Sequence, residues 1–304
     1  MAVPSSSASL AARAAVVLPG ARQLVADYVE LTKPKVQSLL LLTTVTAMEV
    51  AGSPSVPRIA ITCLGGYLSA GGAGAVNHYY DRDIDARMPR TAGRPVPAGR
   101  ISPRAALRFG CILSALSFVL LSLTINVLAA SLAFGGFAGY VGVYTAWLKR
   151  RTPQNIVIGG AAGAMPPLVG WAATRGSLSW TAVYLFAIVF YWTPPHFWAL
   201  SLLMKDEYAQ AGVPMMPVVR GERETRRQIL LYTLLLYAIS QLPFCAGAFG
   251  GIYLVSSMAL GFAFIGGAWM LCRRADRRTA LHLYLFSLLY LALLFGAMVA
   301  DVKL

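Results

Sequence analysis

Carboxylates are scarce in this sequence, yet three aspartates and an asparagine crowd into one short stretch. Asn77, Asp81 and Asp85 follow one another at intervals of four residues. On a helix this spacing keeps the three side chains on one face, whereas Asp83 points away from it. Carboxylate and amide oxygens suit Mg²⁺, which typically takes one or two carboxylates together with phosphate oxygens and water. The pattern predicts a metal site, and its alternative is a solvated helix end whose acids pair with nearby arginines.

A second acidic pair, Asp206 and Glu207, lies in "KDEYAQAGVPMMP". If both acidic segments lie on one side of the same domain, they supply two facing Mg²⁺ sites. Arginine and lysine would then hold the free oxygens of a diphosphate, arginine through two parallel hydrogen bonds. The basic candidates for this role are Arg90, Arg94, Lys149 and Arg150. The alternative for each of these bases is a topology signal that also contacts lipid headgroups.

His196 is a third candidate, because it falls inside an apolar run directly after Pro194 and Pro195. A polar side chain within a membrane segment is a functional candidate by default. On a regular helix it would face the same way as Glu207 and lie roughly 15 Å deeper. The alternative is a histidine that hydrogen-bonds a carbonyl freed by the prolines.

The elements that position these residues are apolar helices. The chain is 57% hydrophobic and only 12% charged, which is too apolar for an ordinary soluble domain. Continuous apolar runs near the length of a membrane span exclude a β-barrel, whose strands alternate. We expect an all-α integral membrane protein with nine transmembrane helices, at about 36–52, 58–76, 104–123, 127–147, 154–174, 179–200, 228–247, 250–271 and 281–300.

The net charge of +14 could suggest nucleic acid, but its distribution does not. With the N-terminus in the cytoplasm, all but three of the 26 lysines and arginines fall on the cytoplasmic side, the exceptions being Arg58, Arg175 and Lys303. This is the positive-inside pattern, so we expect no nucleic-acid partner. Residues 1–27 are expected to form a disordered tail, with an organelle transit peptide as the alternative, and residues 28–304 a single membrane-embedded domain.

The motifs resemble a known family. "NHYYDRDID" fits the NxxxDxxxD pattern of UbiA-type intramembrane prenyltransferases. Further segments are similar to the haem branch of that superfamily, the protoheme IX farnesyltransferases or haem o synthases. They are "ELTKPKVQSLLL", "YTAWLKRRTPQNIVIGGAAGAMPPLVGW" and "WTPPHFWALSLLMKDEYAQAGVPMMPVV". The likeness covers nearly the whole chain from about residue 28. Glu207 stands where relatives can have aspartate, which leaves open whether Asp206 or Glu207 is the main metal ligand.

The resemblance implies a UbiA-type helical bundle whose central cavity opens at the cytoplasmic side. It implies a Mg²⁺-dependent transfer of the farnesyl group of farnesyl diphosphate to a vinyl group of haem b, with addition of water, giving haem o. It assigns metal binding and catalysis to Asn77, Asp81, Asp85, Asp206 and Glu207, and makes His196 a candidate haem ligand. Membrane lipid surrounds such an enzyme, and haem a synthase is implied as a downstream partner. The expected location is the bacterial inner membrane, with the mitochondrial inner membrane as the alternative.

Two other readings stay open at this point. A UbiA-type enzyme could prenylate another acceptor, such as an aromatic acid or a chlorophyll-like ring. A secondary transporter is the other class, but transporters place ionisable or discontinuous segments near the membrane midplane. Here nearly all carboxylates lie at the cytoplasmic helix ends, and only Glu49 and Asp301 lie toward the other side.

Overall fold

The computed structural model describes residues 20–304, and within them every regular element is helical. The elements are α1 (Ala21–Leu31), α2 (Pro34–Ala51), α3 (Val56–Tyr80), α4 (Arg82–Arg87), α5 (Pro103–Thr124), α6 (Val127–Ala138), η1 (Gly139–Trp147), η2 (Leu148–Arg150), α7 (Asn155–Gly163), α8 (Met165–Arg175), α9 (Trp180–Leu203), α10 (Lys205–Gln210), α11 (Met216–Val219), α12 (Gly221–Cys245), α13 (Gly251–Arg274) and α14 (Arg277–Lys303).

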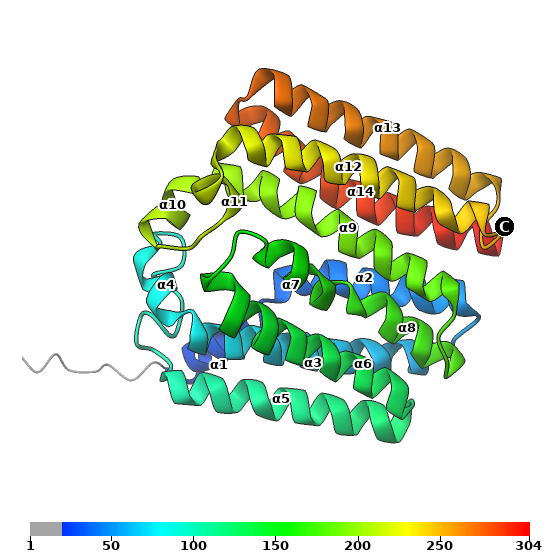
Figure 1. Ribbon diagram of the computed structural model, residues 1–304. Coiled ribbons are helices and arrows are strands. Elements are labelled where there is room, and N and C mark those ends of the chain that lie inside the picture. The colour runs from blue at the N-terminus through cyan, green and yellow to red at the C-terminus, as the bar shows by residue number, and fades with distance from the viewer. Residues whose placement is uncertain (1–19) are drawn as a thin grey trace, which may run out of the picture.

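The long helices form one bundle in which α9 lies between the α12–α13–α14 group and the helices before it (Figure 1). The largest apolar core joins these two parts and includes Leu185, Trp198, Phe264 and Tyr290, all fully buried. The short helices α4, α10 and α11 gather at one end of the bundle (Figure 1). We call this end, which carries both acidic segments, the acidic-loop end.

Seven helical segments in the described part of the chain are long and apolar enough to cross a membrane. This agrees with an integral membrane protein. The predicted spans at 36–52 and 179–200 correspond to α2 and α9, which are helical but are not among the seven. The expected number of nine therefore stays a prediction.

Glycines allow the closest helix contacts. A β-carbon on Gly72 of α3 would lie 2.6 Å from the carbonyl oxygen of Gly110 on α5, so only glycine fits there. Close backbone approach through small residues is a common mode of helix packing in lipid. This contact fixes the C-terminal third of α3, where Asn77 follows Gly72 by five residues.

The proline pairs act differently from one another. The break between α7 and α8 lies at Ala164, two residues before Pro166 and Pro167. Helix α9 instead continues through Pro194 and Pro195 to Leu203. It ends there, and α10 begins at Lys205 after a non-helical Met204. The condition for aligning His196 with Glu207, one regular helix through both residues, is therefore not met.

The expected disordered tail at 1–27 is partly corrected. Residues 1–19 lie outside the described residues, but α1 is helical from Ala21 onward. Asp27 on this helix is buried and accepts hydrogen bonds from Gln23 and from Arg100, at 3.0 Å each. An ion pair to the loop before α5 thus attaches α1 to the bundle. The apolar-run criterion did not predict this short amphipathic helix, because its 11 residues are far fewer than a membrane span needs.

Candidate functional site

The first acidic segment keeps the predicted face although α3 ends within it. Asp81 separates α3 from α4, yet its amide donates to the Asn77 carbonyl at 2.8 Å, and the Asp85 amide donates to the Asp81 carbonyl at 2.7 Å. These i to i−4 bonds preserve the helical register. The Asn77 side-chain amide also donates to Asp81 Oδ2 at 2.7 Å. All three side chains are buried.

Three cations contact this face: Arg94 from the loop that follows α4, and Lys33 and Lys149 from distant parts of the chain. Lys149 donates to Asp81 Oδ2, and Arg94 donates to both oxygens of Asp85 at 2.9 Å. Lys33 donates to Asn77 Oδ1 at 2.6 Å. Hydrogen bonds between ionised groups are stronger than neutral ones, so the face is held by a preorganised set of charges.

Asp83 and its partner Arg150 lie outside this set. The carboxylate is half exposed and accepts two hydrogen bonds from Arg150, at 2.6 and 2.7 Å. The Arg150 contact is the main reason that the pKa of Asp83 falls to about 2. Arg90 is exposed, and none of the ion pairs among residues 20–304 includes it. Of the four predicted diphosphate ligands, the structure therefore brings Arg94 and Lys149 to the buried face.

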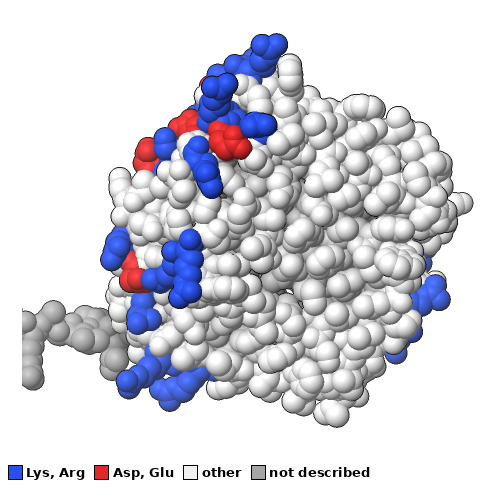
Figure 2. Space-filling view, in the orientation of Figure 1, with Lys and Arg blue, Asp and Glu red and all other residues white. Residues whose placement is uncertain are grey.

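The second acidic segment packs against the first. Tyr208 of α10 is buried in one apolar cluster with Ile84 and Met88 of the first segment and with Tyr144 of η1. Asp206 is exposed, whereas Glu207 is partly buried. The two acidic segments therefore meet at one end of the bundle, as the two-loop prediction requires. Figure 2 shows that most of the visible charge gathers at this end.

Two buried carboxylate oxygens have no hydrogen-bond partner within the described structure, Asp81 Oδ1 and Glu207 Oε2. Such atoms are rare, because leaving a buried acceptor unpaired costs about 1–3 kcal/mol. Two free, hard oxygen donors fit a Mg²⁺ ion that also takes phosphate oxygens and water. No group of three or more acidic, histidine or cysteine side chains among residues 20–304 forms a ready-made ligand set.

Lys33 is the main residue that sequence reasoning missed, since it was counted only as a topology signal. It precedes Pro34 with a φ of 54°, in the left-handed region that residues other than glycine rarely adopt. Burial, followed by repulsion from Arg94 and Lys149, lowers the pKa of Lys33 to about 7. An unusual backbone conformation and a perturbed pKa are both enriched at functional sites.

His78, the residue after Asn77 on α3, is also buried. The residue is 1% exposed, and neither of its ring nitrogens has a partner in the described structure. On a regular helix, adjacent residues such as His78 and Asn77 point about 100° away from each other. The burial of His78 shows that this face of α3 is also covered.

His196 is part of α9, and its side chain faces α14. Its Nδ1 is 2.7 Å from Ser287 Oγ, and its ring stacks on Trp192 and Tyr284 with centroid distances of 4.3 and 4.9 Å. Trp192 Nε1 donates to the Ser287 carbonyl at 2.7 Å. The histidine is thus held at one nitrogen by a neighbouring helix. None of these contacts of His196 involves a residue of the two acidic segments.

Together, an apolar helical bundle and a charged face buried at one of its ends define a polytopic membrane protein with a site for a charged group. The family described as UbiA prenyltransferase family matches residues 39–294, and this chain belongs to it.

Relatives and solved structures agree with this membership. Protoheme IX farnesyltransferase of Chloroflexus aurantiacus is 57% identical over 93% of this chain, and the protein of the same name from Symbiobacterium thermophilum is 55% identical over 92%. The match covers 49% of the Chloroflexus protein and 95% of the Symbiobacterium one, so the chain spans about half the length of the former.

Among solved structures, a digeranylgeranylglyceryl phosphate synthase superposes with a TM-score of 0.76 at 20% identity, covering 92% of this chain and 99% of that one. A UbiA homolog from Archaeoglobus fulgidus bound to DMAPP and Mg²⁺ superposes with a TM-score of 0.65 at 15% identity, covering 90% and 99%. At these identities the likeness shows the fold.

Proposed function

We propose that this protein transfers the farnesyl group of farnesyl diphosphate to a vinyl group of haem b, giving haem o and diphosphate. The observation that carries the proposal is the buried face of Asn77, Asp81 and Asp85, held by three cations at one end of an apolar bundle. A diphosphate would dock at this face while its hydrocarbon tail enters the apolar helices. The name shared by the Chloroflexus and Symbiobacterium relatives supports haem b as the acceptor.

The reaction breaks the allylic C–O bond of farnesyl diphosphate, and the electron pair leaves with the diphosphate. The vinyl π electrons of haem b form the new C–C bond to farnesyl C1. Water then adds to the resulting carbocation and loses a proton, which leaves a hydroxyl group on the product. Leaving-group departure is the step that charge can accelerate, because negative charge develops on the diphosphate.

The residues of the site divide this work. Asp81 and Glu207, with their unpartnered oxygens, would hold Mg²⁺ together with Asn77, Asp85 and Asp206. Bound Mg²⁺ supplies positive charge that polarises the phosphate oxygens. Arg94, Lys149 and Lys33 would contact the diphosphate directly, and Arg90 and Arg150 would add positive charge at the exposed rim.

His196 is proposed to bind haem. Ser287 occupies its Nδ1, which leaves Nε2 as the nitrogen that can face iron. A hydrogen bond at one ring nitrogen commonly orients a metal-bound histidine, and loss of such a partner weakens metal affinity roughly 10–100-fold.

Replacing the residue and its support tests this role. His196→Ala should weaken haem binding or change the haem spectrum, and Ser287→Ala should do the same more mildly. Neither should change Mg²⁺-dependent binding of farnesyl diphosphate. Unaltered haem affinity and spectrum in a folded His196→Ala protein would remove the residue from the site.

The finer topology belongs to the same proposal. Nine spans with a cytoplasmic N-terminus would place the acidic-loop end in the cytoplasm, where the positive-inside rule puts basic loops. A bacterial inner membrane fits this arrangement, with a central cavity open toward that side. The proposal also includes a single domain over residues 28–304. Its product would pass to a haem a synthase. Labelling of single cysteines at Ser53 and Arg220 from either side of a membrane tests the topology.

The deciding experiment is product analysis. Purified full-length chain with haem b, farnesyl diphosphate and Mg²⁺ should yield haem whose mass has grown by one farnesyl group and one hydroxyl group. Chelation of Mg²⁺ and the Asp81→Ala variant serve as controls. Transfer to an aromatic acid but not to haem would favour another UbiA-type acceptor. No transfer at all, with substrate flux in liposomes, would favour a transporter.

A further inference from the structure

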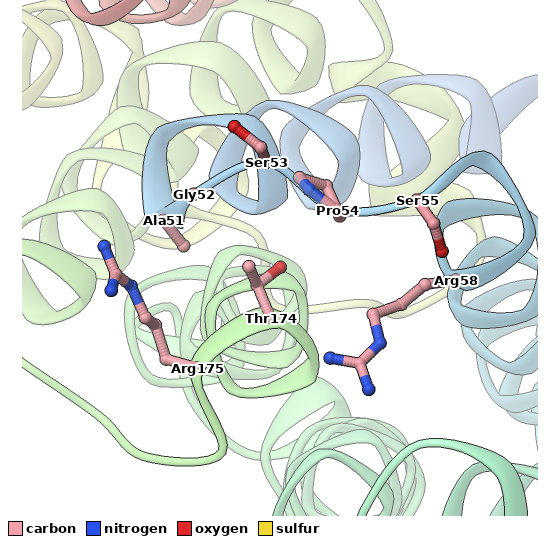
Figure 3. Close-up of a pocket in the computed structure, with 8 residues that line it drawn as sticks. All are labelled: Ala51, Gly52, Ser53, Pro54, Ser55, Arg58, Thr174 and Arg175. Atoms are coloured by element: carbon pink, nitrogen blue, oxygen red, sulfur yellow. The ribbon is translucent and has the colours of Figure 1, made fainter.

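The end of the bundle opposite the acidic loops contains a cavity of ≈ 420 Å³. It lies where α2 ends, α3 begins and α8 ends, and it is lined by Ala51, Gly52, Ser53, Pro54, Ser55, Arg58, Thr174 and Arg175. Figure 3 shows the turn of Gly52–Ser55 above Thr174, with Arg58 on one side and Arg175 on the other. The cavity lies roughly 29 Å along α3 from Asn77, which is about the thickness of the hydrocarbon core.

The basic residues here are exceptions to the charge distribution of the whole chain. Only Arg58, Arg175 and Lys303 fall on this side of the predicted spans. Two of them line the cavity, and the third donates to the carbonyl of Gly52, at 3.1 Å, in the wall of the same cavity. The positive-inside rule disfavours arginine on this side, so topology does not account for their presence.

The acids of this end are already engaged. Glu49 pairs with Lys303 at 3.0 Å. Asp301 accepts from the amides of Gly250 and Tyr253 at the start of α13. Among the described residues, no ion pair and no side-chain hydrogen bond includes the guanidinium group of Arg58 or Arg175. The cavity therefore has two unneutralised guanidinium groups, with the hydroxyls of Ser53, Ser55 and Thr174 beside them.

Helix stability does not explain Arg58 either. It lies in the first turn of α3, where the helix dipole disfavours a positive charge. Arg175, in the last turn of α8, interacts favourably with the helix dipole. That interaction leaves the hydrogen-bond donors of its side chain free. Five donors in a planar fork match the oxygens of carboxylates and phosphates, and phosphate is the anion that lipid headgroups supply at the ends of membrane spans.

We propose that this cavity binds the phosphodiester headgroup of an anionic phospholipid from the leaflet opposite the acidic loops. The lining residues lie at the ends of apolar helices, the depth at which lipid phosphates are found. The distance to Asn77 is far longer than a tetrapyrrole ring is wide, so a haem reacting at the acidic-loop end does not reach this cavity. The proposal is independent of the chemistry at that end.

Hydrogen exchange on the full-length protein in lipid nanodiscs tests the site locally. Discs of phosphatidylglycerol are compared with discs of phosphatidylcholine, and exchange is followed in peptides that cover 50–58 and 172–179. In phosphatidylglycerol the amides of both peptides in the wild-type protein should exchange at least roughly threefold more slowly than in phosphatidylcholine. Arg58→Gln with Arg175→Gln should abolish this difference. Circular dichroism and size-exclusion profiles check that the double variant is folded.

Matched controls identify the cause and the source of the anion. Arg277→Gln with Arg278→Gln removes the same charge at the other end and should keep the lipid-dependent protection. Arg58→Lys keeps the charge but loses the fork, and should retain only part of it. Equal exchange in both lipids, or an unchanged lipid response in the Arg58→Gln, Arg175→Gln variant, would overturn the proposal. Equal protection by inorganic phosphate in phosphatidylcholine discs would overturn the assignment to lipid.

Discussion

The two acidic segments reach the same end of the bundle in different electrostatic states. In the α3–α4 segment each aspartate accepts from a cation: Asp81 from Lys149, Asp83 from Arg150 and Asp85 from Arg94. In α10, no ion pair among the described residues includes Asp206 or Glu207, and one Glu207 oxygen is buried without a partner. The first segment is therefore preorganised by the protein's own charges, whereas the second is free to take a ligand from outside.

This difference predicts different roles in catalysis. A cation held beside Asp81 can move from the carboxylate to a diphosphate oxygen when substrate and metal arrive, because both anions compete for it. Glu207 has no cation to give and can only accept. We infer that the first segment positions both metal and bases, and that the second completes the metal site.

The largest effect is expected at Asp81, which contacts both Asn77 and Lys149. Asp81→Ala should reduce farnesyl transfer at least about 10³-fold, because it removes a metal ligand and leaves the partly buried Lys149 without its carboxylate partner. Asp85→Ala should be similarly inactive, since it frees Arg94. Initial rates of haem product formation measure the loss. Asp83→Ala is the control, and equal loss in that variant would mean that the helical-face argument is wrong.

The second-largest effect is expected at Glu207, and it distinguishes this residue from Asp206, the other carboxylate of α10. Glu207→Gln should weaken the apparent affinity for Mg²⁺ by roughly 10–100-fold, because its buried oxygen is replaced by an amide. Asp206→Asn, on an exposed residue of the same short helix, should change that affinity by no more than about threefold. Titration of activity with Mg²⁺ measures both. The reverse order would assign the main metal ligand to Asp206 and would leave the unpartnered Glu207 oxygen unexplained.

A smaller effect is expected when Arg94 is replaced by lysine, which keeps the positive charge but loses the planar guanidinium group. Arg94→Lys should raise the dissociation constant for farnesyl diphosphate about tenfold, because lysine cannot form two parallel hydrogen bonds. Haem binding should be unchanged. Arg90→Lys is the matched control on an exposed arginine of the same loop. Wild-type diphosphate affinity in both variants would leave these arginines as topology signals only.

The parts of the site that could be predicted are those set by local spacing. The interval of four residues predicts the contact of Asn77 with Asp81, and long apolar runs predict the helices that bury them. The break at Pro166–Pro167 is local in the same sense. The partners of Asn77 and Asp81 are not local, since Lys33 precedes α2 and Lys149 lies in η2, two segments that meet α3 only in the folded bundle.

Other features depend on packing that periodicity does not encode. No pattern in one sequence predicts that Ser287 of α14 faces His196 of α9, or that α10 turns away from the axis of α9 at Met204. Lys33 did carry one signal, because a residue before proline is conformationally restricted. That signal concerns the backbone and does not name the side chain's partner.

The smallest effect concerns Asp83, the one aspartate of the first segment whose ion pair is exposed to solvent. Asp83→Asn should lower the stability of the folded protein by less than about 1 kcal/mol at neutral pH, because water screens such a pair. Arg150 lowers the pKa of Asp83 from 3.8 to about 2, so the carboxylate stabilises the folded state above about pH 4. This contribution should disappear as the pH falls from 4 toward 2.

A double-mutant cycle with Arg150→Gln measures the coupling, using thermal midpoints of the detergent-solubilised protein at pH 7 and pH 3. The coupling should be smaller at pH 3, and Asp83→Asn should leave the affinity for farnesyl diphosphate within about twofold, since the buried face does not include this residue. If Asp83→Asn instead raised that affinity while Arg150→Gln lowered it, Arg150 would be a cation that exchanges between carboxylate and diphosphate. Asp83 would then belong with Asp81 and Asp85, and the first segment would act as a single unit of three carboxylates.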